Sequence, residues 1–331
     1  MTLLILTKTE FIGSGPNVLI FKEYDMIARL LRARSFDIEV TNHCNIDCVF
    51  CPRKKIPVFG FMSEHTFNCF LNNTPLRRYD CVSFIGLGEP LLNKNLPRFI
   101  KLTKERYPDT HVTVFTNGTL LTAEMTNSLI DAGLDFLVVS FNGVDSAEYE
   151  SKMKGANFNV TVENIKRAAE LCAKSRIYFA VDYIATKENI DRKSEIEAFW
   201  RAMGVSNLWG LSMTSRCGLV NVSDMTPIQK PGLHGHSCEK FEFMPFLSWQ
   251  GDVYLCSYDI LREHKFGNIC QDTYKTIEKR RKRIIRNHEW PLQCNSCEDD
   301  MRFAMGRNLF GSLRLRDFSI REIVTGLIRM V

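Results

Sequence analysis

Three cysteines that lie close together are the residues whose types and spacing point most directly to chemistry. Cys44, Cys48 and Cys51 form a Cys-x3-Cys-x2-Cys run directly after an alternating apolar segment at 36–41. Zinc sites usually pair one Cys-x2-Cys with a second, distant pair, so the run is not typical of zinc. Three clustered thiolates can hold three irons of a 4Fe–4S cube and leave the fourth iron open to a ligand. A zinc site or a set of buried thiols is the alternative.

A second cysteine group lies further along the chain. It consists of Cys238, Cys256, Cys294 and Cys297, of which the last two form Cys-x2-Cys. Four thiolates suit an additional 4Fe–4S cluster, and they also suit a structural zinc ion. Two histidines, at positions 234 and 236, precede the group. We interpret them as loop residues, because four cysteines already complete a ligand set.

These residues must be positioned by the elements around them, and the chain from residue 36 alternates between strand-like and helix-like patterns. Strands are predicted at 36–41, 80–85, 111–115, 135–140, 177–185 and 207–212. Helices are predicted between them, for example at 96–106, 122–131, 159–174 and 191–203. Thr122 and Asp191 are expected to cap helix starts, and Gly133 and Gly204 to follow helix ends. Six alternations predict an α/β fold, a partial (β/α)6 TIM-like barrel with a parallel sheet.

The chain divides into five predicted parts. An N-terminal extension at 1–35, with a helix at its end, precedes the barrel at 36–215. A segment with many Gly, Pro and Ser residues at 216–236 is interpreted as a linker, and a small cysteine-rich domain at 237–300 follows it. The tail at 301–331 ends in an amphipathic helix at 320–331. We expect this helix to pack on the body, with binding to a membrane surface or a partner as the alternative.

The composition is that of an ordinary globular protein. Of 331 residues, 45% are hydrophobic and 24% are charged, and the formal net charge of +5 weakly favours an anionic substrate. The twelve cysteines occur without a secretory signal, which argues against a disulfide scaffold and favours a cytoplasmic location. No stretch approaches the ~20 apolar residues that span a bilayer. The basic run at 279–283 is interpreted as a solvated helix face, so no nucleic-acid partner is expected.

Glycine-rich and polar turns follow three of the predicted strands. Gly-Leu-Gly-Glu-Pro at 86–90 follows the second strand, Thr-Asn-Gly at 116–118 the third, and Ser-Phe-Asn-Gly at 140–143 the fourth. Active sites of barrel enzymes lie at the carboxyl ends of the strands, and glycine lets the backbone approach a ligand. We therefore expect these turns to line a ligand site beside the first cysteine group.

Together, the cysteine run and the turns resemble the radical S-adenosylmethionine (radical SAM) superfamily. The resemblance covers about residues 36–300 and implies that Cys44, Cys48 and Cys51 hold a 4Fe–4S cluster that binds SAM. It also implies a set of residues that contact SAM, namely Gly86, Gly88, Glu89, Asn117, Ser140 and Asn142. The chain departs from the family pattern where Leu87 separates the two glycines and where Asn142 stands in place of a common aspartate.

The second cysteine group resembles the SPASM/twitch auxiliary-cluster domain of the same superfamily. The segment from Gly251 to Cys256 and the later Gly-Asn-Ile at 267–269 carry this resemblance. The larger SPASM form uses cysteines after the final pair, and this chain has none beyond Cys297. The resemblance therefore implies the twitch form, in which all four cysteines of the second group hold one auxiliary 4Fe–4S cluster.

The resemblance implies an enzyme that reductively cleaves SAM to a 5′-deoxyadenosyl radical, which abstracts a hydrogen atom from a substrate C–H bond. Sugar and aminocyclitol dehydrogenases and epimerases have an arrangement of cysteines similar to that of this chain. Oxidation of a secondary alcohol is therefore the leading expectation. An electron donor such as flavodoxin or ferredoxin would act as partner. The alternatives are epimerisation of a sugar or peptide, a peptide-modifying maturase, and a non-enzymatic iron–sulfur or zinc scaffold.

Two further side chains are candidates for catalysis. Cys217 follows the last predicted strand, where its thiol could donate a hydrogen atom to a substrate radical or could be an inert packing group. Asp182 interrupts an apolar strand, so it should contact the substrate or SAM or belong to a structural ion pair. Glu39, in the strand that leads to the first cysteine group, is expected to face the substrate. The other cysteines are interpreted mostly as small buried side chains, at 69, 81, 172 and 270.

Overall fold

The computed structural model describes residues 33–212, 214–221, 238–287, 289–295 and 297. Several predictions fall on other parts of the chain and lie outside the described residues. These are most of the N-terminal extension with its helix, residues 222–236 of the linker with both of its histidines, and the amphipathic tail helix.

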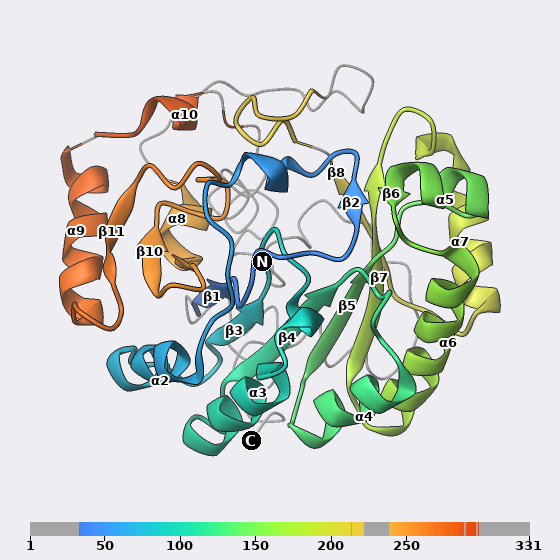
Figure 1. The fold of residues 1–331 in the computed structure, drawn as a ribbon, viewed down its shortest axis with the longest axis horizontal. Helices are drawn as coiled ribbons and strands as arrows, with labels where there is room; N and C mark the ends of the chain where they lie inside the picture. The colour runs from blue at the N-terminus through green and yellow to red at the C-terminus, as the bar shows by residue number, and fades with distance from the viewer. Residues whose placement is uncertain (1–32, 213, 222–237, 288, 296, 298–331) are drawn as a thin grey trace, which may run out of the picture.

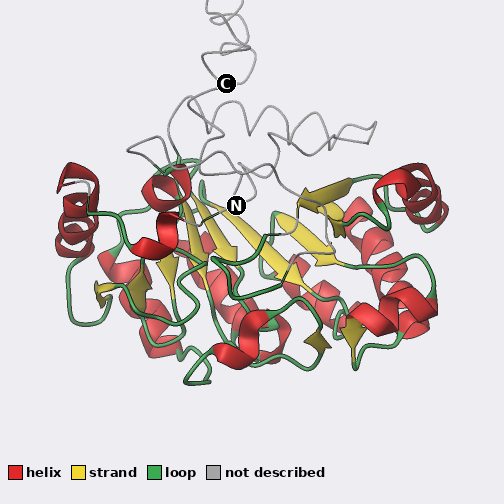
Figure 2. Ribbon diagram, turned by 90° about the horizontal axis from the view of Figure 1, so that it is seen from above, coloured by secondary structure: helices red, strands yellow, loops and turns green. Residues whose placement is uncertain are grey.

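Six parallel strands form the centre of the molecule, in the same order in space as in the sequence. They are β1 (Ser35–Ile38), β3 (Cys81–Phe84), β4 (His111–Thr116), β5 (Phe136–Ser140), β7 (Tyr178–Ala185) and β8 (Leu208–Ser212). The helices between them are α2 (Glu64–Asn73), α3 (Leu96–Arg106), α4 (Ala123–Asp131), α5 (Ser146–Lys152), α6 (Phe158–Lys174) and α7 (Lys193–Ala202). The sheet is curved and these helices cover its outer side (Figures 1 and 2). The predicted partial barrel is confirmed.

The helix boundaries follow the capping chemistry that the sequence predicts, with one exception. The Thr122 side chain accepts a hydrogen bond from the Met125 N–H at 3.1 Å, and Gly133 and Gly204 adopt φ values of 91° and 80° just after their helices. The predicted cap at Asp191 is wrong. Asp191 lies inside a 3-10 turn, Ile190–Arg192, because the chain turns once before α7 begins at Lys193.

The cysteine-rich part of the chain extends the same sheet. Strand β9 (Phe246–Leu247) pairs parallel to β1, and β10 (Asp252–Tyr254) and β11 (Lys265–Asn268) add antiparallel strands beyond it, so the sheet has nine strands among the described residues. The helices of this part are α8 (Glu239–Phe243), α9 (Tyr274–Asn287) and α10 (Leu292–Asn295). A second, two-stranded sheet pairs β2 (Asp47–Cys48) with β6 (Met153–Lys154). Two short 3-10 turns, Pro52–Lys55 and Pro90–Leu92, follow the first cysteine group and the Gly-Leu-Gly-Glu motif.

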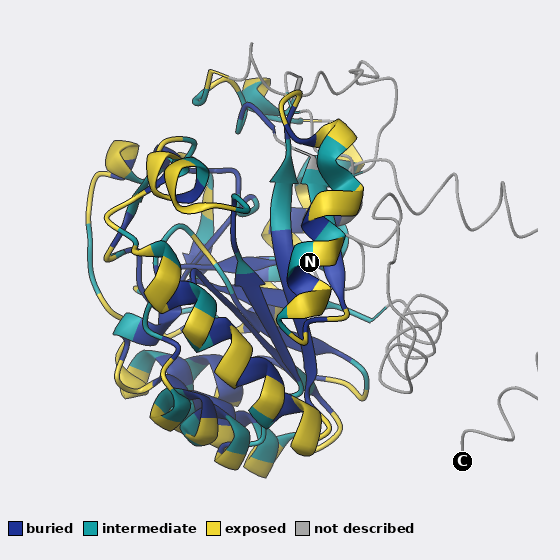
Figure 3. Cartoon of the chain, turned by 90° about the vertical axis from the view of Figure 1, so that its right-hand side faces the viewer, coloured by how far each residue is buried: buried dark blue, intermediate teal, exposed yellow. Residues whose placement is uncertain are grey.

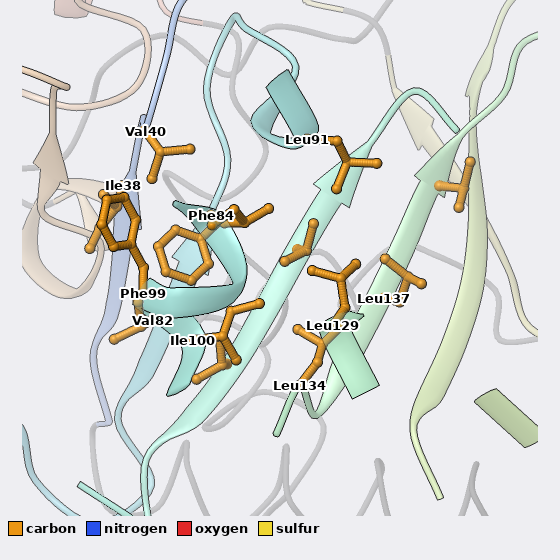
Figure 4. Close-up of a cluster of buried hydrophobic side chains, with 14 of the residues drawn as sticks. Ile38, Val40, Val82, Phe84, Leu91, Phe99, Ile100, Leu129, Leu134 and Leu137 are labelled. Carbon is orange, nitrogen blue, oxygen red and sulfur yellow. The ribbon is translucent and has the colours of Figure 1, made fainter. Parts of the chain in front are cut away.

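The two faces of the central sheet differ in chemistry because successive side chains of a strand point to opposite faces. The outer face packs on the helices, and Figure 4 shows Val82, Phe84 and Leu137 against Phe99 and Leu129. The inner face carries a smaller apolar cluster: Phe115, Phe136, Val138, Tyr178, Ala180 and Trp209. Figure 3 shows the buried strands and the helices exposed on their outer sides. On this same inner face, beyond the apolar cluster, Ser140 and Asp182 lie opposite one another toward the carboxyl ends of β5 and β7.

The basic run at 279–283 lies in α9. Four of its side chains are exposed, as the interpretation of a solvated helix face requires, but Arg281 is only 2% exposed. Its guanidinium donates to Glu278 and to the Phe241 carbonyl oxygen, so it is a structural group. Among the helices that the structure describes, none is long and apolar enough to span a membrane.

Candidate active site

The first cysteine group lies on the loop that follows β1. Cys44, Cys48 and Cys51 are each partly buried, and none of them is in a disulfide. Burial, and after it the charges of the neighbouring Cys51 and Cys44, raise the pKa of Cys48 to about 12. The three thiols are therefore close enough for their negative charges to repel one another when they ionise. A bound cation would stabilise the thiolates and lower their pKa values. This donor set fits three irons of a 4Fe–4S cluster.

The Gly-Leu-Gly-Glu motif packs directly against this loop. A Cβ on Gly88 would lie 2.1 Å from the Thr41 carbonyl oxygen, and the Glu89 N–H donates to the His43 carbonyl at 2.8 Å. A Cβ on Gly86 would lie 2.7 Å from Cγ of Glu39. Both glycines are thus needed for the close approach of two protein segments, which fixes the backbone around Cys44.

Glu89 connects the motif to the end of β4. Its side chain is buried, and its carboxylate accepts hydrogen bonds from the Thr116 hydroxyl at 2.7 Å, the Asn117 N–H at 2.7 Å and the Leu91 N–H at 3.1 Å. Burial nevertheless raises the pKa of Glu89 to about 7. The structure therefore gives Glu89 a positioning role, and its predicted contact with SAM stays a prediction.

Asn117 contacts the first cysteine group, and Asn142 contacts the short strand that pairs with it. The Asn117 amide nitrogen lies 3.7 Å from Sγ of Cys44, and its oxygen accepts from the Thr119 N–H at 2.9 Å. The Asn142 oxygen accepts from the Ile184 N–H at 2.8 Å, and its nitrogen lies 3.8 Å from the sulfur of Met153, the residue that pairs with Cys48. Asn142 thus joins β7 to the cysteine loop.

Asp182 faces the interior of the barrel beside Ser140. The two residues are partners across β5 and β7. Burial raises the pKa of Asp182 to about 6, and the hydrogen bond with Ser140 opposes that rise. No salt bridge to Asp182 occurs within the described part of the chain, so the ion-pair interpretation finds no support there. The carboxyl is left with a hydroxyl partner and a pKa close to neutral.

Glu39 has a partner that sequence reasoning missed. Arg262 forms a salt bridge with Glu39 at 2.6 Å, with side chains 10% and 1% exposed, and the Leu87 N–H donates to the same carboxylate at 3.2 Å. The guanidinium also lies 4.6 Å from the ring centre of Phe246. Glu39 is therefore a buried structural link between the cysteine-rich part and the Gly-Leu-Gly-Glu motif, and its contact with a substrate stays a prediction. The signal that the sequence did contain is a carboxylate within a strand that has apolar residues on both sides of it, because a carboxylate that becomes buried there requires a cation.

The second cysteine group contains one thiol more than predicted. A hydrogen bond with Cys297 raises the pKa of Cys217, and burial and the charges of Cys297, Cys256 and Cys294 raise it further. Burial raises the pKa of Cys256 well above its usual value, while the nearby Lys240 lowers it and Cys238 raises it. The structure thus brings the four predicted cysteines together, and it adds Cys217 to them. Four thiolates fit a 4Fe–4S cluster, and Cys217 would lie beside it.

Residues 214–220 lie between the two cysteine groups. Arg216 lies 4.5 Å from the ring centre of Tyr258, whose N–H donates to Sγ of Cys256 at 3.4 Å. Burial raises the pKa of Cys51, whereas the backbone N–H of Arg53 and then the charge of Arg216 lower it. Arg216 and Cys217 both adopt left-handed backbone conformations, with φ of 50° and 59°. This uncommon turn lets adjacent side chains reach different cysteine groups.

The remaining four cysteines divide into two pairs. Cys81 and Cys172 are buried, as predicted. Cys69 of α2 and Cys270, two residues beyond β11, form a disulfide, so their interpretation as buried thiols is wrong. Sequence spacing could not reveal this pair, because 201 residues separate its members.

Comparison with known families matches two domains in this chain. The radical SAM superfamily matches residues 38–181, which include the first cysteine group and the turns. The SPASM family, an iron–sulfur cluster-binding domain, matches residues 238–298, which include the four predicted cysteines of the second group.

Curated relatives cover part of the chain. A tungsten-containing aldehyde ferredoxin oxidoreductase cofactor-modifying protein of Pyrococcus furiosus is 28% identical over 204 residues, which cover 58% of this chain and 56% of the relative. The S-adenosyl-L-methionine-dependent 2-deoxy-scyllo-inosamine dehydrogenase of Niallia circulans is 31% identical over 107 residues, which cover 31% of this chain and 43% of the relative. The chain spans about half the length of these relatives.

The fold is also similar to that of a solved structure, BtrN in complex with AdoMet and 2-DOIA. The TM-score is 0.57 at 20% sequence identity, and the match covers 81% of this chain and 94% of that chain. The two family matches and the shared fold agree with the residues described above. The chain belongs to the radical SAM superfamily, with a domain for a SAM-binding 4Fe–4S cluster followed by a SPASM domain for an auxiliary cluster.

Proposed function

We propose that the protein is a radical SAM enzyme that oxidises a secondary alcohol on a sugar or aminocyclitol. The segment at 214–220 is the observation that carries this proposal. The charge of Arg216 lowers the pKa of Cys51 in the first cysteine group, and Cys217 forms a hydrogen bond with Cys297 in the second. A substrate held at this segment would lie close to both cysteine groups. The likeness to a 2-deoxy-scyllo-inosamine dehydrogenase supports the same substrate class.

The chain's own residues would hold two clusters and a substrate in one place. When bound, SAM and the clusters supply the radical that removes a hydrogen atom and an acceptor for the electron left behind. Cys44, Cys48 and Cys51 would hold the first cluster, and Asn117 and the tightly packed Gly88 would shape its surroundings. An electron donor of the flavodoxin or ferredoxin type would supply the reducing electron.

Asp182 is the group that would accept the hydroxyl proton of the substrate alcohol. Oxidation of an alcohol to a ketone removes a hydrogen atom, an electron and the hydroxyl proton. Asp182 is 4% exposed, lies on the inner face of the sheet, and has a pKa raised by burial to about 6. Such a carboxyl is mostly ionised at neutral pH and can accept the proton at its oxygen.

The experiment uses the full-length, anaerobically reconstituted protein with SAM, dithionite and a panel of sugars and aminocyclitols. We expect 5′-deoxyadenosine together with an equal amount of ketone for one class of substrate. Asp182→Asn should keep SAM cleavage and lose most of the ketone. Absence of 5′-deoxyadenosine would contradict the enzyme assignment, and 5′-deoxyadenosine without an oxidised product on every panel member would contradict the substrate class.

Epimerisation is the second candidate function, and Cys217 is the observation that favours it. A thiol between the two cysteine groups could deliver a hydrogen atom to a substrate radical. Its hydrogen bond with Cys297 also fits a packing role beside the auxiliary cluster. The two roles predict different behaviour in heavy water, as set out in the Discussion.

A further inference from the structure

The disulfide between Cys69 and Cys270 joins two parts of the chain that the cluster chemistry does not require to be joined. Cys69 lies in α2 of the barrel, and Cys270 lies just beyond β11 in the SPASM domain, with 5.1 Å between their Cα atoms. Figure 1 shows α2 near the β10–β11 hairpin. Neither cysteine belongs to the two groups assigned to clusters, so their proximity calls for a separate explanation.

The contact around this pair is built independently of the sulfur atoms. The Asn73 amide nitrogen donates to the Ile269 carbonyl at 2.7 Å. The Asn268 oxygen accepts from the Cys270 N–H at 2.9 Å, while its nitrogen donates to Asp252 at 2.7 Å. These bonds hold the Cys270 backbone against α2, so the two sulfur atoms would stay close together even as thiols.

The surroundings of the pair also favour thiol chemistry. His65 lies one helical turn before Cys69, with its Nε2 at 3.7 Å from the Cys69 sulfur. A cationic imidazole beside a thiol stabilises the thiolate, which is the reactive form. His65 and Cys270 are exposed and Cys69 is partly buried, whereas Cys81 and Cys172 are buried. Of these four cysteines, the two in the pair are therefore the ones that a soluble disulfide or reductant can reach.

We propose that Cys69 and Cys270 form a reversible redox clasp that fastens the SPASM domain to the barrel. The Cys69 thiolate attacks one sulfur of a low-molecular-weight disulfide, which forms a mixed disulfide and releases one thiol. The Cys270 thiolate then attacks the sulfur of Cys69 and releases the second thiol. The protein loses two electrons and two protons, and the small disulfide takes up both to become two thiols. A reducing cell interior would open the clasp, and oxidative conditions would close it.

The clasp acts on the junction that carries the two cluster domains. Closing a loop of 201 residues removes freedom from the unfolded chain and leaves both clusters' cysteines untouched. We expect the oxidised protein to unfold about 5–10 °C above the reduced one. The Cys69→Ser and Cys270→Ser variants should show no such shift between oxidising and reducing buffers.

The test uses the full-length, anaerobically reconstituted protein in buffers of defined ratio of oxidised to reduced glutathione. Free thiols are blocked with one alkylating reagent, and after reduction the released thiols are labelled with another and located by mass spectrometry. We expect Cys69 and Cys270 to change state together at a single midpoint, with iron content unchanged. His65→Gln should slow closure roughly three- to tenfold and leave the midpoint nearly the same.

Three results would overturn the clasp. The pair would stay unlinked across the whole range of buffers, or oxidation would release iron, which would show that the cluster cysteines take part. Alternatively, one zinc ion per chain would be bound and would be lost in Cys69→Ser, Cys270→Ser and His65→Ala alike. That last result would assign the same three side chains to a metal site.

Discussion

The two cysteine groups are built in different ways. Cys44, Cys48 and Cys51 lie on one loop within eight residues of sequence, and the loop is shaped by contacts with Gly88 and Glu89. The second group is gathered from distant segments, and its members lie at 217, 238, 256, 294 and 297. The first group depends on local backbone geometry, whereas the second depends on how the SPASM domain docks on the barrel.

The docking contact is therefore as important to the second group as the loop is to the first. Strand β9 continues the barrel sheet beside β1, and Arg262 reaches across to Glu39. The same Glu39 carboxylate accepts from Leu87 in the motif that shapes the first group. One buried ion pair thus connects the SPASM domain to the motif that shapes the first group, so changing this pair tests the docking contact directly.

Removing that ion pair should have the largest effect on stability. Arg262→Leu leaves the Glu39 carboxylate buried without a cation, which typically costs about 3–5 kcal/mol of unfolding free energy. We expect the double variant Glu39→Gln, Arg262→Leu to recover part of the loss, as measured by chemical unfolding under anaerobic conditions.

The surface pair of Arg98 with Glu64 provides a matched control. Its atoms lie 3.6 Å apart and its side chains are 47% and 46% exposed, so Arg98→Leu should cost less than about 1 kcal/mol. Equal losses of unfolding free energy for Arg262→Leu and Arg98→Leu would show that the buried pair does not stabilise the contact between the two domains.

Glu89→Ala tests the first site alone. A charge-assisted hydrogen bond from the SAM amino group to Glu89 would contribute about 1.5–3 kcal/mol, so we expect SAM to bind roughly 10- to 150-fold more weakly with the cluster spectrum preserved. The measurement is equilibrium binding of SAM to reconstituted protein. An unchanged dissociation constant would remove Glu89 from SAM recognition and leave it only its bonds to Thr116 and Asn117.

Asp182→Asn tests the inner face of the barrel through pH. The folded-state pKa of Asp182 is raised to about 6, above the unfolded value near 3.8. The folded protein therefore binds the proton more tightly, and this residue lowers stability as pH rises from about 4 to 6. Asp182→Asn should raise the unfolding free energy by about 1–3 kcal/mol at pH 8 and change it little at pH 4. A gain that is equal at both pH values would contradict the raised pKa.

Cys217→Ala should have the smallest effect if the protein is a dehydrogenase. Because the electron would then leave through the auxiliary cluster, the variant should form ketone at nearly the normal rate. If the protein is an epimerase, the variant should still form 5′-deoxyadenosine but lose the inverted product. In that case the wild-type product made in heavy water should carry one deuterium, because thiol protons exchange with solvent.

The sequence predicts the barrel well and identifies the candidate residues of the first site, because both depend on short-range patterns. Strand–helix alternation, the cap at Thr122 and the Cys-x3-Cys-x2-Cys run are all local features. The partner of Glu39 could not be predicted in this way, because 223 residues separate it from Arg262. The position of Cys217 beside Cys297 and the disulfide at Cys69 also depend on how the two domains dock. Domain docking cannot be predicted from short-range sequence patterns.

The count of iron and sulfide in one variant tests the central claim, that the two cysteine groups hold two separate clusters. We predict about eight irons and eight sulfides per chain in the wild type. Changing Cys44, Cys48 and Cys51 together to Ala should leave about four of each, with a cluster spectrum but no SAM cleavage. Loss of nearly all iron in this variant, or one tightly held zinc ion in place of the remaining cluster, would contradict the account.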